Sequence, residues 1–383
     1  MIKILTVIGA RPQIIKAAAI NRVVNNLFKN EIKEIILHTG QHYDDEMSAF
    51  FFDELGITKP DFNLHVGSAS HANQSAEMMI GIEKVVNEVF PDFILVYGDT
   101  NSTLAAALVG AKIHIPVIHI EAGLRSFDKY MPEELNRITT DHCSTLLFSP
   151  TMTGITNLNN EGINSTRSNF NINSPGVFHV GDVMLDNSLF YAKMAERKST
   201  ILNDNQLEDK DFILATVHRD YNTDAVDRLL SIVKAFDELT RRKQMKIVWP
   251  MHPRISNLLK KELYADVKGI IEENSQIVIL PPASFFDIIS LENNAKLIIT
   301  DSGGVQKEAY FFKKPCLILR PHTEWVELVN SGHALLCDAD EKRILDGADV
   351  MLNKTMKEFD PIFGNGEAAS SICKIILDSF KGC

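Results

Sequence analysis

Acidic side chains occur at three points of one stretch of the sequence, and their spacing is typical of acid/base chemistry. Two apolar segments, residues 93–97 and 117–120, are predicted strands separated by an Ala-rich helix. The acidic residues that follow them are Asp99, Glu121 and the pair Glu133 and Glu134. Because ligands bind outside the carboxyl ends of parallel strands, these carboxylates are expected at one rim of a βαβ unit. Packing does not explain such a cluster, whereas proton transfer requires it.

A possible anion site lies at the start of the chain. Residues 2–8 form a continuous apolar segment, Gly9 begins a turn, and a helix is predicted from Gln13. A helix N-terminus attracts anions through its N–H groups and its dipole, and Arg11 and Lys16 add positive charge there. The alternative is that both are ordinary surface cations, since the GxGxxG pattern of a dinucleotide fold does not occur.

The second half carries a glycine turn after the predicted strand 297–300. Its residues are Asp301, Ser302, Gly303 and Gly304, and a helix follows from about residue 305. Small residues before a helix N-terminus let a diphosphate approach the backbone. Glu308, one turn further, can accept hydrogen bonds from the two hydroxyls of a ribose. The alternative is an ordinary helix N-cap formed by Asp301 or Ser302.

Three histidines follow predicted strands. His218 comes after residues 212–217, His252 after residues 246–249, and His42 lies in a polar loop after a strand that ends at residue 38. An imidazole at such a strand end can contact a diphosphate or transfer a proton near neutral pH. The alternative for each is a solvated loop residue.

Strands and helices alternate along the whole chain, which predicts an α/β fold with two doubly wound, Rossmann-like domains. The polar segment 164–175 suits a domain junction. We therefore expect an N-terminal domain over residues 1–173 that carries the carboxylates and a C-terminal domain over 174–360. The helix predicted within residues 361–383 is expected to pack back on the first domain.

Composition narrows the classes of function. The chain has 383 residues, 45% of them hydrophobic, and a net charge of −11, which disfavours binding to nucleic acid. No apolar segment reaches the roughly 20 residues that span a bilayer, and the N-terminus does not resemble a signal peptide. The five cysteines are scattered and form no CxxC pair, so we expect a reducing cytoplasm and no metal site.

Taken together, the motifs resemble the non-hydrolysing UDP-N-acetylglucosamine 2-epimerase family. They are Gly9 to Gln13, Gly98 to Thr103, His119 to Arg125, Pro132 to Arg137 and Asp301 to Gly304, and they span nearly the whole chain. The resemblance implies two domains of the glycosyltransferase-B type with the active site in the cleft between them. It also implies a UDP-sugar substrate, no cofactor or metal, and a homodimer, for which the segment Phe50 to Phe52 is a candidate contact.

The resemblance assigns roles residue by residue. The catalytic positions are Asp99, Glu121, Glu133 and His218. The substrate-binding positions are Arg11 and Lys16 near phosphate and sugar, Ser302, Gly303 and Gly304 at the diphosphate, and Glu308 at the ribose. His42 and His252 are candidates for a second UDP-sugar site that activates the enzyme.

One departure from the family pattern concerns substrate choice. Many UDP-N-acetylglucosamine epimerases carry Arg after a Thr-Glu pair, and this chain has Trp325 there. The surrounding residues are more similar to the branch that acts on UDP-2,3-diacetamido-2,3-dideoxyglucuronate, where an indole could face a second acetamido group. UDP-N-acetylglucosamine is the alternative substrate, and a packing role is the alternative for the indole.

Other classes of protein share this architecture, because fold does not determine function. A glycosyltransferase would need an acceptor groove and a single base. A hydrolysing epimerase carries different motifs. A nucleotide-sugar sensor would not need the carboxylates or His218.

Overall fold

The computed structural model describes residues 1–40, 52, 54–165, 169–208, 210–353 and 358–381. The chain divides into two compact units, Met1–Asn187 with Pro361–Cys383, and Ser188–Asp360. In the candidate dimer contact Phe50 to Phe52, Phe50 and Phe51 lie outside the described residues. In the part that is described, no helix has the length and apolar character needed to cross a membrane.

The N-terminal unit is built on a parallel sheet with the strand order β3-β2-β1-β4-β5-β6-β7. The strands are β1 (Ile2–Ile8), β2 (Ile32–His38), β3 (Phe62–Asn63), β4 (Phe93–Tyr97), β5 (Val117–Ile120), β6 (Leu146–Ser149) and β7 (Gly176–His179). In the central strands almost every side chain is buried, because helices cover both faces of the sheet. Continuous apolar segments therefore form strands here.

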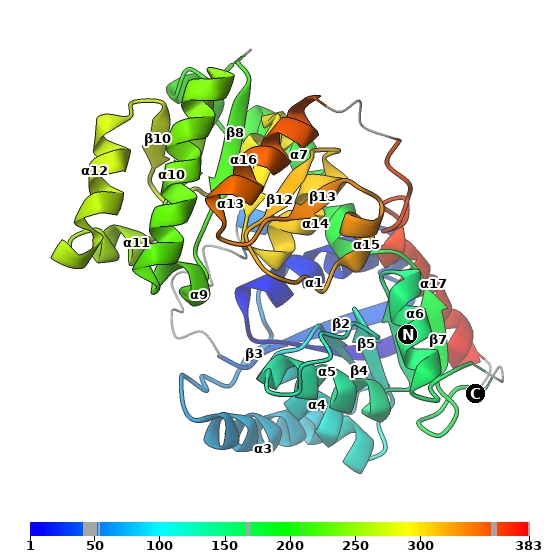
Figure 1. Ribbon diagram of the computed structural model, residues 1–383. Coiled ribbons are helices and arrows are strands. Elements are labelled where there is room, and N and C mark those ends of the chain that lie inside the picture. The colour runs from blue at the N-terminus through cyan, green and yellow to red at the C-terminus, as the bar shows by residue number, and fades with distance from the viewer. Residues whose placement is uncertain (41–51, 53, 166–168, 209, 354–357, 382–383) are drawn as a thin grey trace. The chain divides into compact units, whose positions relative to one another are not determined.

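Helices of the N-terminal unit connect these strands and cover the sheet. They are α1 (Arg11–Val23) with a π-helical continuation (Val24–Phe28), α3 (His71–Val89), α4 (Asn101–Lys112), α5 (Pro132–Cys143), α6 (Met152–Asn160) and α17 (Ala368–Lys381). The helix α7 (Val183–Lys198) begins in this unit and continues into the C-terminal unit after Asn187. α3 and α4 lie on one face, where Met78 and Ile82 pack against Leu5 and Val96. α1 lies on the opposite face (Figure 1).

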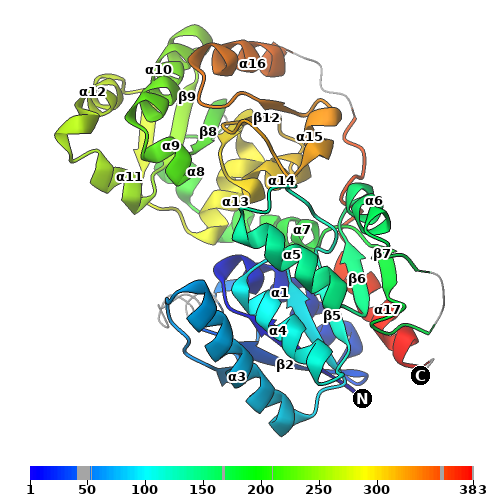
Figure 2. The same cartoon turned by 60° about the horizontal axis from the view of Figure 1, so that its bottom comes forward.

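The C-terminal unit repeats this architecture with the strand order β10-β9-β8-β11-β12-β13. Its strands are β8 (Phe212–Thr216), β9 (Lys246–Pro250), β10 (Ile277–Leu280), β11 (Leu297–Thr300), β12 (Cys316–Ile318) and β13 (Ala334–Leu336). Its helices are α8 (Ile201–Asp204), α9 (Asp220–Thr223), α10 (Val226–Lys243), α11 (Pro253–Leu258), a 3-10 turn (Glu262–Tyr264), α12 (Ala265–Glu273), α13 (Phe285–Asn294), α14 (Gly303–Phe311), α15 (Val326–Asn330) and α16 (Glu341–Asn353). Figure 2 shows α10 and α16 on one side of this sheet and α13 and α14 on the other.

The division between the units differs from the boundary expected at residue 173. Strand β7 pairs with β6, with Leu146 opposite Gly176, so this segment completes the first sheet. Asn187, on α7, donates to the Ile15 carbonyl oxygen at 2.6 Å. The first unit therefore extends to Asn187. Strand β7 lies in the range expected for the second domain, but it forms its hydrogen bonds with β6 of the first.

The returning helix α17 is tied to the N-terminal unit by Asp186. This carboxylate accepts the backbone N–H groups of Ala368 at 3.1 Å and Ala369 at 2.8 Å, so it caps the start of α17. Burial raises the pKa of Asp186 to about 6, although the two N–H donors oppose the shift.

We predict that Asp186 makes stability fall as the pH rises from about 4 to 6. Its pKa is 3.8 in the unfolded reference and about 6 in the folded protein, so the folded state binds the proton more tightly. Its contribution to the free energy of unfolding is then greatest below pH 4 and is reduced by up to about 3 kcal/mol above pH 6.

The measurement is the stability of Asp186→Asn minus that of the wild type, from urea unfolding between pH 4 and 8. The difference should increase through pH 4 to 6 in favour of the variant and then stay constant. Asp211→Asn, at an exposed position, serves as the control. A difference that does not vary with pH would contradict the prediction.

Candidate functional site

In each unit the candidate residues cluster where the order of the strands reverses. In the N-terminal sheet this point lies between β1 and β4, and in the C-terminal sheet between β8 and β11. Adjacent parallel strands whose connections leave in opposite directions open a crevice at their carboxyl ends. Arg11 and Asp99 follow β1 and β4, and His218 and Asp301 follow β8 and β11.

Gln13 joins the two loops at the first of these points. Its side-chain oxygen accepts the N–H groups of Gly9 at 2.9 Å and Ala10 at 3.1 Å. Its amide nitrogen donates to the carbonyl oxygen of Tyr97 and to the Thr103 hydroxyl, both at 2.9 Å. All four hydrogen bonds are buried, so this amide fixes the turn after β1 to the end of β4 and leaves Arg11 exposed at the start of α1.

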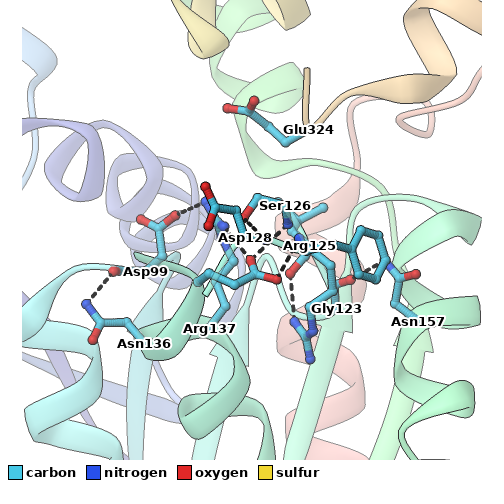
Figure 3. Close-up of polar contacts among 12 residues, drawn as sticks. Asp99, Gly123, Arg125, Ser126, Asp128, Asn136, Arg137, Asn157 and Glu324 are labelled. Carbon is cyan, nitrogen blue, oxygen red and sulfur yellow. Dashed lines mark hydrogen bonds and ion pairs between the residues drawn. The ribbon is translucent and has the colours of Figure 1, made fainter. Parts of the chain in front are cut away.

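Asp99 is held by side chains from α5. Its carboxylate pairs with Arg137, Nη2 to Oδ2 at 2.6 Å, and its backbone carbonyl accepts the Asn136 amide at 2.8 Å (Figure 3). Burial raises the pKa of Asp99, and Glu121 adds to the shift, while Arg137 and Lys16 oppose it. A carboxyl group whose pKa is shifted toward neutrality is suited to exchange protons.

Glu121 follows β5 and forms an ion pair with Lys16 from α1. Its φ of 76° lies in the left-handed region, which a residue other than glycine rarely adopts. Gly98, with φ of 62°, makes room for this pair, since a Cβ atom there would lie 3.2 Å from both Glu121 Oε2 and Lys16 Nζ. The motifs after β1, β4 and β5 thus converge. The sequence predicted the common rim of Asp99 and Glu121, but not the approach of Lys16 from α1.

The neighbouring acids Glu133 and Glu134 have separate environments at the start of α5. Glu133 is exposed, whereas Glu134 is buried and accepts the N–H groups of Ser126 at 2.8 Å and Phe127 at 3.0 Å. Burial alone would raise the pKa of Glu134, but these donors and Arg137 lower it below its usual range. Glu134 therefore holds the loop before α5, and Glu133 is the member of the pair that a ligand can reach.

In the C-terminal unit, Asp301 organises the loop after β8. Its fully buried carboxylate accepts the N–H groups of His218 at 3.1 Å and Arg219 at 3.0 Å, and the Asn222 amide at 3.0 Å. These bonds use both carboxylate oxygens on backbone and amide donors. Asp301 is thus an anchor for His218 and does not cap α14.

His218 lies with its Nδ1 3.3 Å from Asp301 Oδ1. Partial burial lowers the pKa of His218, with Asp301 opposing and Arg219 and His252 reinforcing the shift. The neutral form that results at pH 7 can accept a proton or donate a hydrogen bond. The His252 ring lies 6.5 Å away, and its Nδ1 accepts the N–H of Arg254 as the N-cap of α11.

The first turn of α14 has no side-chain cap, because its N-cap residue Ser302 makes no such hydrogen bond. A Cβ atom on Gly304 would meet nothing closer than 3.9 Å, whereas one on Gly303 would lie 2.8 Å from Glu324 Oε1. Glu324 is itself paired with Arg320 at 3.0 Å. An anion at the start of α14 would therefore meet backbone N–H groups, and the negative charge of nearby Glu324 would be balanced by Arg320.

Glu308 lies on the same turn, since a Cβ atom on Gly304 would be 3.9 Å from its Oε2. Behind it is Glu292 of α13, which is wholly buried. Burial first, and then the Glu308 carboxylate, raises the pKa of Glu292 well above its ordinary value. Burial and the neighbouring Glu308 carboxylate thus favour the protonated form of Glu292.

Two further candidate residues from the sequence are Trp325 and His42. The Trp325 indole is buried, and the Lys307 ammonium lies 4.2 Å from its ring centre. This geometry agrees with the packing alternative, and contact of the indole with a ligand stays a prediction. His42 lies outside the described residues.

Comparison with known proteins agrees with this architecture and these motifs. The family model described as UDP-N-acetylglucosamine 2-epimerase matches residues 26–377. The chain belongs to this family.

Relatives in the family cover nearly all of the chain. A UDP-N-acetylglucosamine 2-epimerase homolog of Methanococcus maripaludis is 46% identical over 376 residues, 98% of this chain and 99% of that protein. The UDP-2,3-diacetamido-2,3-dideoxy-D-glucuronate 2-epimerase of Pseudomonas aeruginosa is 42% identical, with 98% and 99% covered. The crystal structure of Methanocaldococcus jannaschii UDP-GlcNAc 2-epimerase in complex with UDP-GlcNAc and UDP has a TM-score of 0.83 at 39% identity and covers 98% and 99%. Both the epimerase-family resemblance and the two Rossmann-like domains are thereby confirmed.

Sequence reasoning missed the residues that hold these family motifs in place. Gln13, Glu134 and Asp301 were visible in the motifs, but nothing distinguished a side chain that binds the backbone from one that faces a ligand. Glu292 lies in no motif. Its only signal is an acidic residue directly after the mainly apolar segment Ile288 to Leu291 and shortly before a predicted strand.

We predict that Gly98→Ala destabilises the protein more than Gly56→Ala. Both glycines have nearly the same φ, 62° and 65°, so the backbone strain of about 1 kcal/mol or more is common to both changes. Only the Cβ atom at position 98 approaches Glu121 and Lys16, since nothing lies within 4 Å of the one at position 56.

Urea unfolding should show an additional loss of about 1 kcal/mol for Gly98→Ala, and the activity of that variant should fall. Equal losses of stability and equal activities in the two variants would show that Gly98 is required only for its backbone conformation.

Proposed function

We propose that this chain is a non-hydrolysing 2-epimerase of UDP-2-acetamido sugars. The observation that supports this most is the convergence of Asp99 and Glu121 beside Lys16 and Arg137, in a chain of this family. Inverting a carbon requires a proton to leave one face and another to arrive on the opposite face, so a pair of carboxylates with positioned cations is suited to the task.

The proposed reaction has two steps. A carboxylate removes the C2 proton while the C1–O bond breaks, which releases UDP and leaves a 2-acetamidoglucal. The UDP oxygen then adds back to C1 while an acid delivers a proton to the other face of C2, so that substrate and product are isomers. Asp99, Glu121 and the exposed Glu133 are the candidate acids and bases.

The C-terminal unit offers groups suited to the nucleotide. The uncapped start of α14, with Ser302, Gly303 and Gly304, would bind the diphosphate, and Glu308 would accept the ribose hydroxyls. Neutral His218 would donate to the diphosphate or protonate the leaving group. In the N-terminal unit, Arg11 and Lys16 would contact phosphate and sugar.

Two UDP-sugars are candidate substrates. Similarity to the Pseudomonas aeruginosa relative favours UDP-2,3-diacetamido-2,3-dideoxyglucuronate. With this substrate, we propose a role in the synthesis of surface polysaccharides such as O-antigen or capsule. A relative from Methanocaldococcus jannaschii at 39% identity, named UDP-N-acetylglucosamine 2-epimerase, supports UDP-N-acetylglucosamine to a similar degree. Burial of Trp325 weakens one argument for the first of these.

We also propose that the protein is a cytoplasmic homodimer and that a second UDP-sugar activates it. His252 would contact the activator, and it lies beside His218 in the same unit. Sedimentation of the protein, and initial rates with and without added product sugar, test these two points.

The decisive experiment is proton NMR in D₂O with each UDP-sugar in turn. We expect deuterium at C2 and new anomeric signals of the manno isomer from one of them. Release of free sugar would identify a hydrolysing enzyme, and no exchange with either sugar would leave a transferase or a sensor.

We predict that Asp99→Asn, Glu121→Gln and Glu133→Gln each slow C2 exchange by about 10²- to 10⁴-fold, the range expected for a lost acid or base. UDP binding, measured by calorimetry, should persist in all three, because most of the groups proposed for the ribose and the diphosphate lie in the C-terminal unit and none of the three carboxylates is among them. Glu88→Gln, at an exposed position on α3, is the control and should retain full activity. A variant that keeps wild-type exchange would remove its carboxylate from the mechanism.

A further inference from the structure

His119 lies inside the N-terminal unit, behind the rim that carries Asp99 and Glu121. It is on β5 and its side chain is wholly buried. Its Nε2 is 2.9 Å from the carbonyl oxygen of Gly98, and its Nδ1 is 2.6 Å from Asp141 Oδ1 on α5. Both ring nitrogens therefore have a partner, and the proposed chemistry uses neither.

The partners determine how many protons the ring carries. The Gly98 carbonyl oxygen can only accept, so Nε2 must bear a proton. Asp141 also accepts only, provided that it is ionised, and its other oxygen lies 3.1 Å from the N–H of Gly123 and 2.8 Å from Arg125 Nη2. These two donors, the Gly123 N–H and the Arg125 guanidinium, stabilise the ionised form of Asp141 independently of His119. An ionised Asp141 leaves the second proton on Nδ1.

The same hydrogen bonds reach the backbone on both sides of the candidate carboxylates. Gly98 immediately precedes Asp99, and its N–H donates to the Ile120 carbonyl oxygen at 3.0 Å. Gly123 follows Glu121 by two residues, and Asp141 holds its N–H. One buried ion pair thus ties the loop after β4 to the loop after β5.

Arg125 extends this arrangement to the surface of the unit. It pairs with Asp141 and also with Glu161, Nη2 to Oε2 at 2.6 Å, and its neighbourhood with Gly123 and Asn157 is drawn in Figure 3. The charges of His119 and Arg125 together balance those of Asp141 and Glu161. A doubly protonated ring is therefore compatible with complete burial.

We propose that His119 is a positioning residue that carries a proton on both ring nitrogens and, through Asp141, fixes the relative placement of Asp99 and Glu121. This inference rests on the proposed function, since it concerns the geometry of the carboxylates assigned to C2. The groups that face the ring are the Gly98 carbonyl and Asp141, and Arg125 shares the latter.

The first test needs no substrate. Long-range ¹H–¹⁵N correlation spectra of the full-length protein, labelled at histidine, would report the state of each ring, with His119→Gln or Asp141→Asn identifying the signal. We expect two protonated nitrogens for His119 at pH 7.5. In Asp141→Asn we expect one of them to lose its proton at that pH, because the anionic acceptor is gone. A single protonated nitrogen in the wild type would place the proton on Asp141 and overturn the proposal.

The second test measures positioning. His119→Gln keeps a donor for the Gly98 carbonyl but not the charge, so we expect kcat to fall 10- to 100-fold with KM changed by less than about three-fold. Asp141→Asn should make kcat depend on pH near neutrality, which a loss of packing alone would not do. His142→Gln is the matched control, because this neighbouring histidine is about half exposed, and it should leave kcat unchanged.

The outcomes separate this inference from the proposed function. If the wild type turns over no UDP-sugar, the proposed function fails while the spectra still report the protonation of His119. If the wild type is active and His119→Gln has the same kcat, the positioning role fails alone. A His119→Gln variant that does not fold leaves the decision to the wild-type spectrum and to the pH profile of Asp141→Asn, and each of these can overturn the proposal.

Discussion

Repulsion between carboxylates is the constraint on which the N-terminal unit depends. Asp99 and Glu121 end neighbouring strands, so the sheet itself brings two negative charges together. The fold offsets them with cations from two different helices, Lys16 on α1 and Arg137 on α5. Glycine at position 98 is a consequence of this arrangement, because the ion pair of Lys16 with Glu121 occupies the space that a Cβ atom would need.

Both units use a buried aspartate to hold backbone rather than to face a ligand. Asp141 and Asp301 are each almost completely inaccessible to solvent, and each accepts backbone N–H groups from a loop at the carboxyl end of the sheet. A carboxylate is suited to this role because it can accept several donors at once, and charge-assisted bonds are stronger than neutral ones. Loops without regular structure are thereby made rigid enough to present His218 or Glu121 in one orientation.

Much of the fold and part of the site follow from the sequence. The alternation of apolar strands and helices, with the glycine and acidic turns after β1, β4, β5 and β11, was sufficient to predict two doubly wound domains and to place Asp99 and Glu121 at one rim. The ion pair between Lys16 and Glu121 was not predicted. The local pattern could not separate Glu133 from Glu134. Adjacent residues on a helix point about 100° apart, but the sequence does not show which of the two directions faces the loop whose N–H groups bury Glu134. The end of the first unit was misplaced for a similar reason, because the pairing of β7 is decided by the neighbouring strand and not by its own residues. Trp325 was expected at a ligand because its place in the motif was known and its burial was not.

The two units are joined by the chain at two places, after Asn187 and again before Pro361. The C-terminal unit, which begins within α7, is thus an insertion before the helix α17 that completes the N-terminal unit. During synthesis on the ribosome, the whole C-terminal unit leaves the exit tunnel before α17 does. The N-terminal unit therefore stays incomplete, with the side of α1 that contacts α17 uncovered, until the second unit has been synthesised. Removal of α17 alone would therefore uncover α1, which lies near the other end of the sequence.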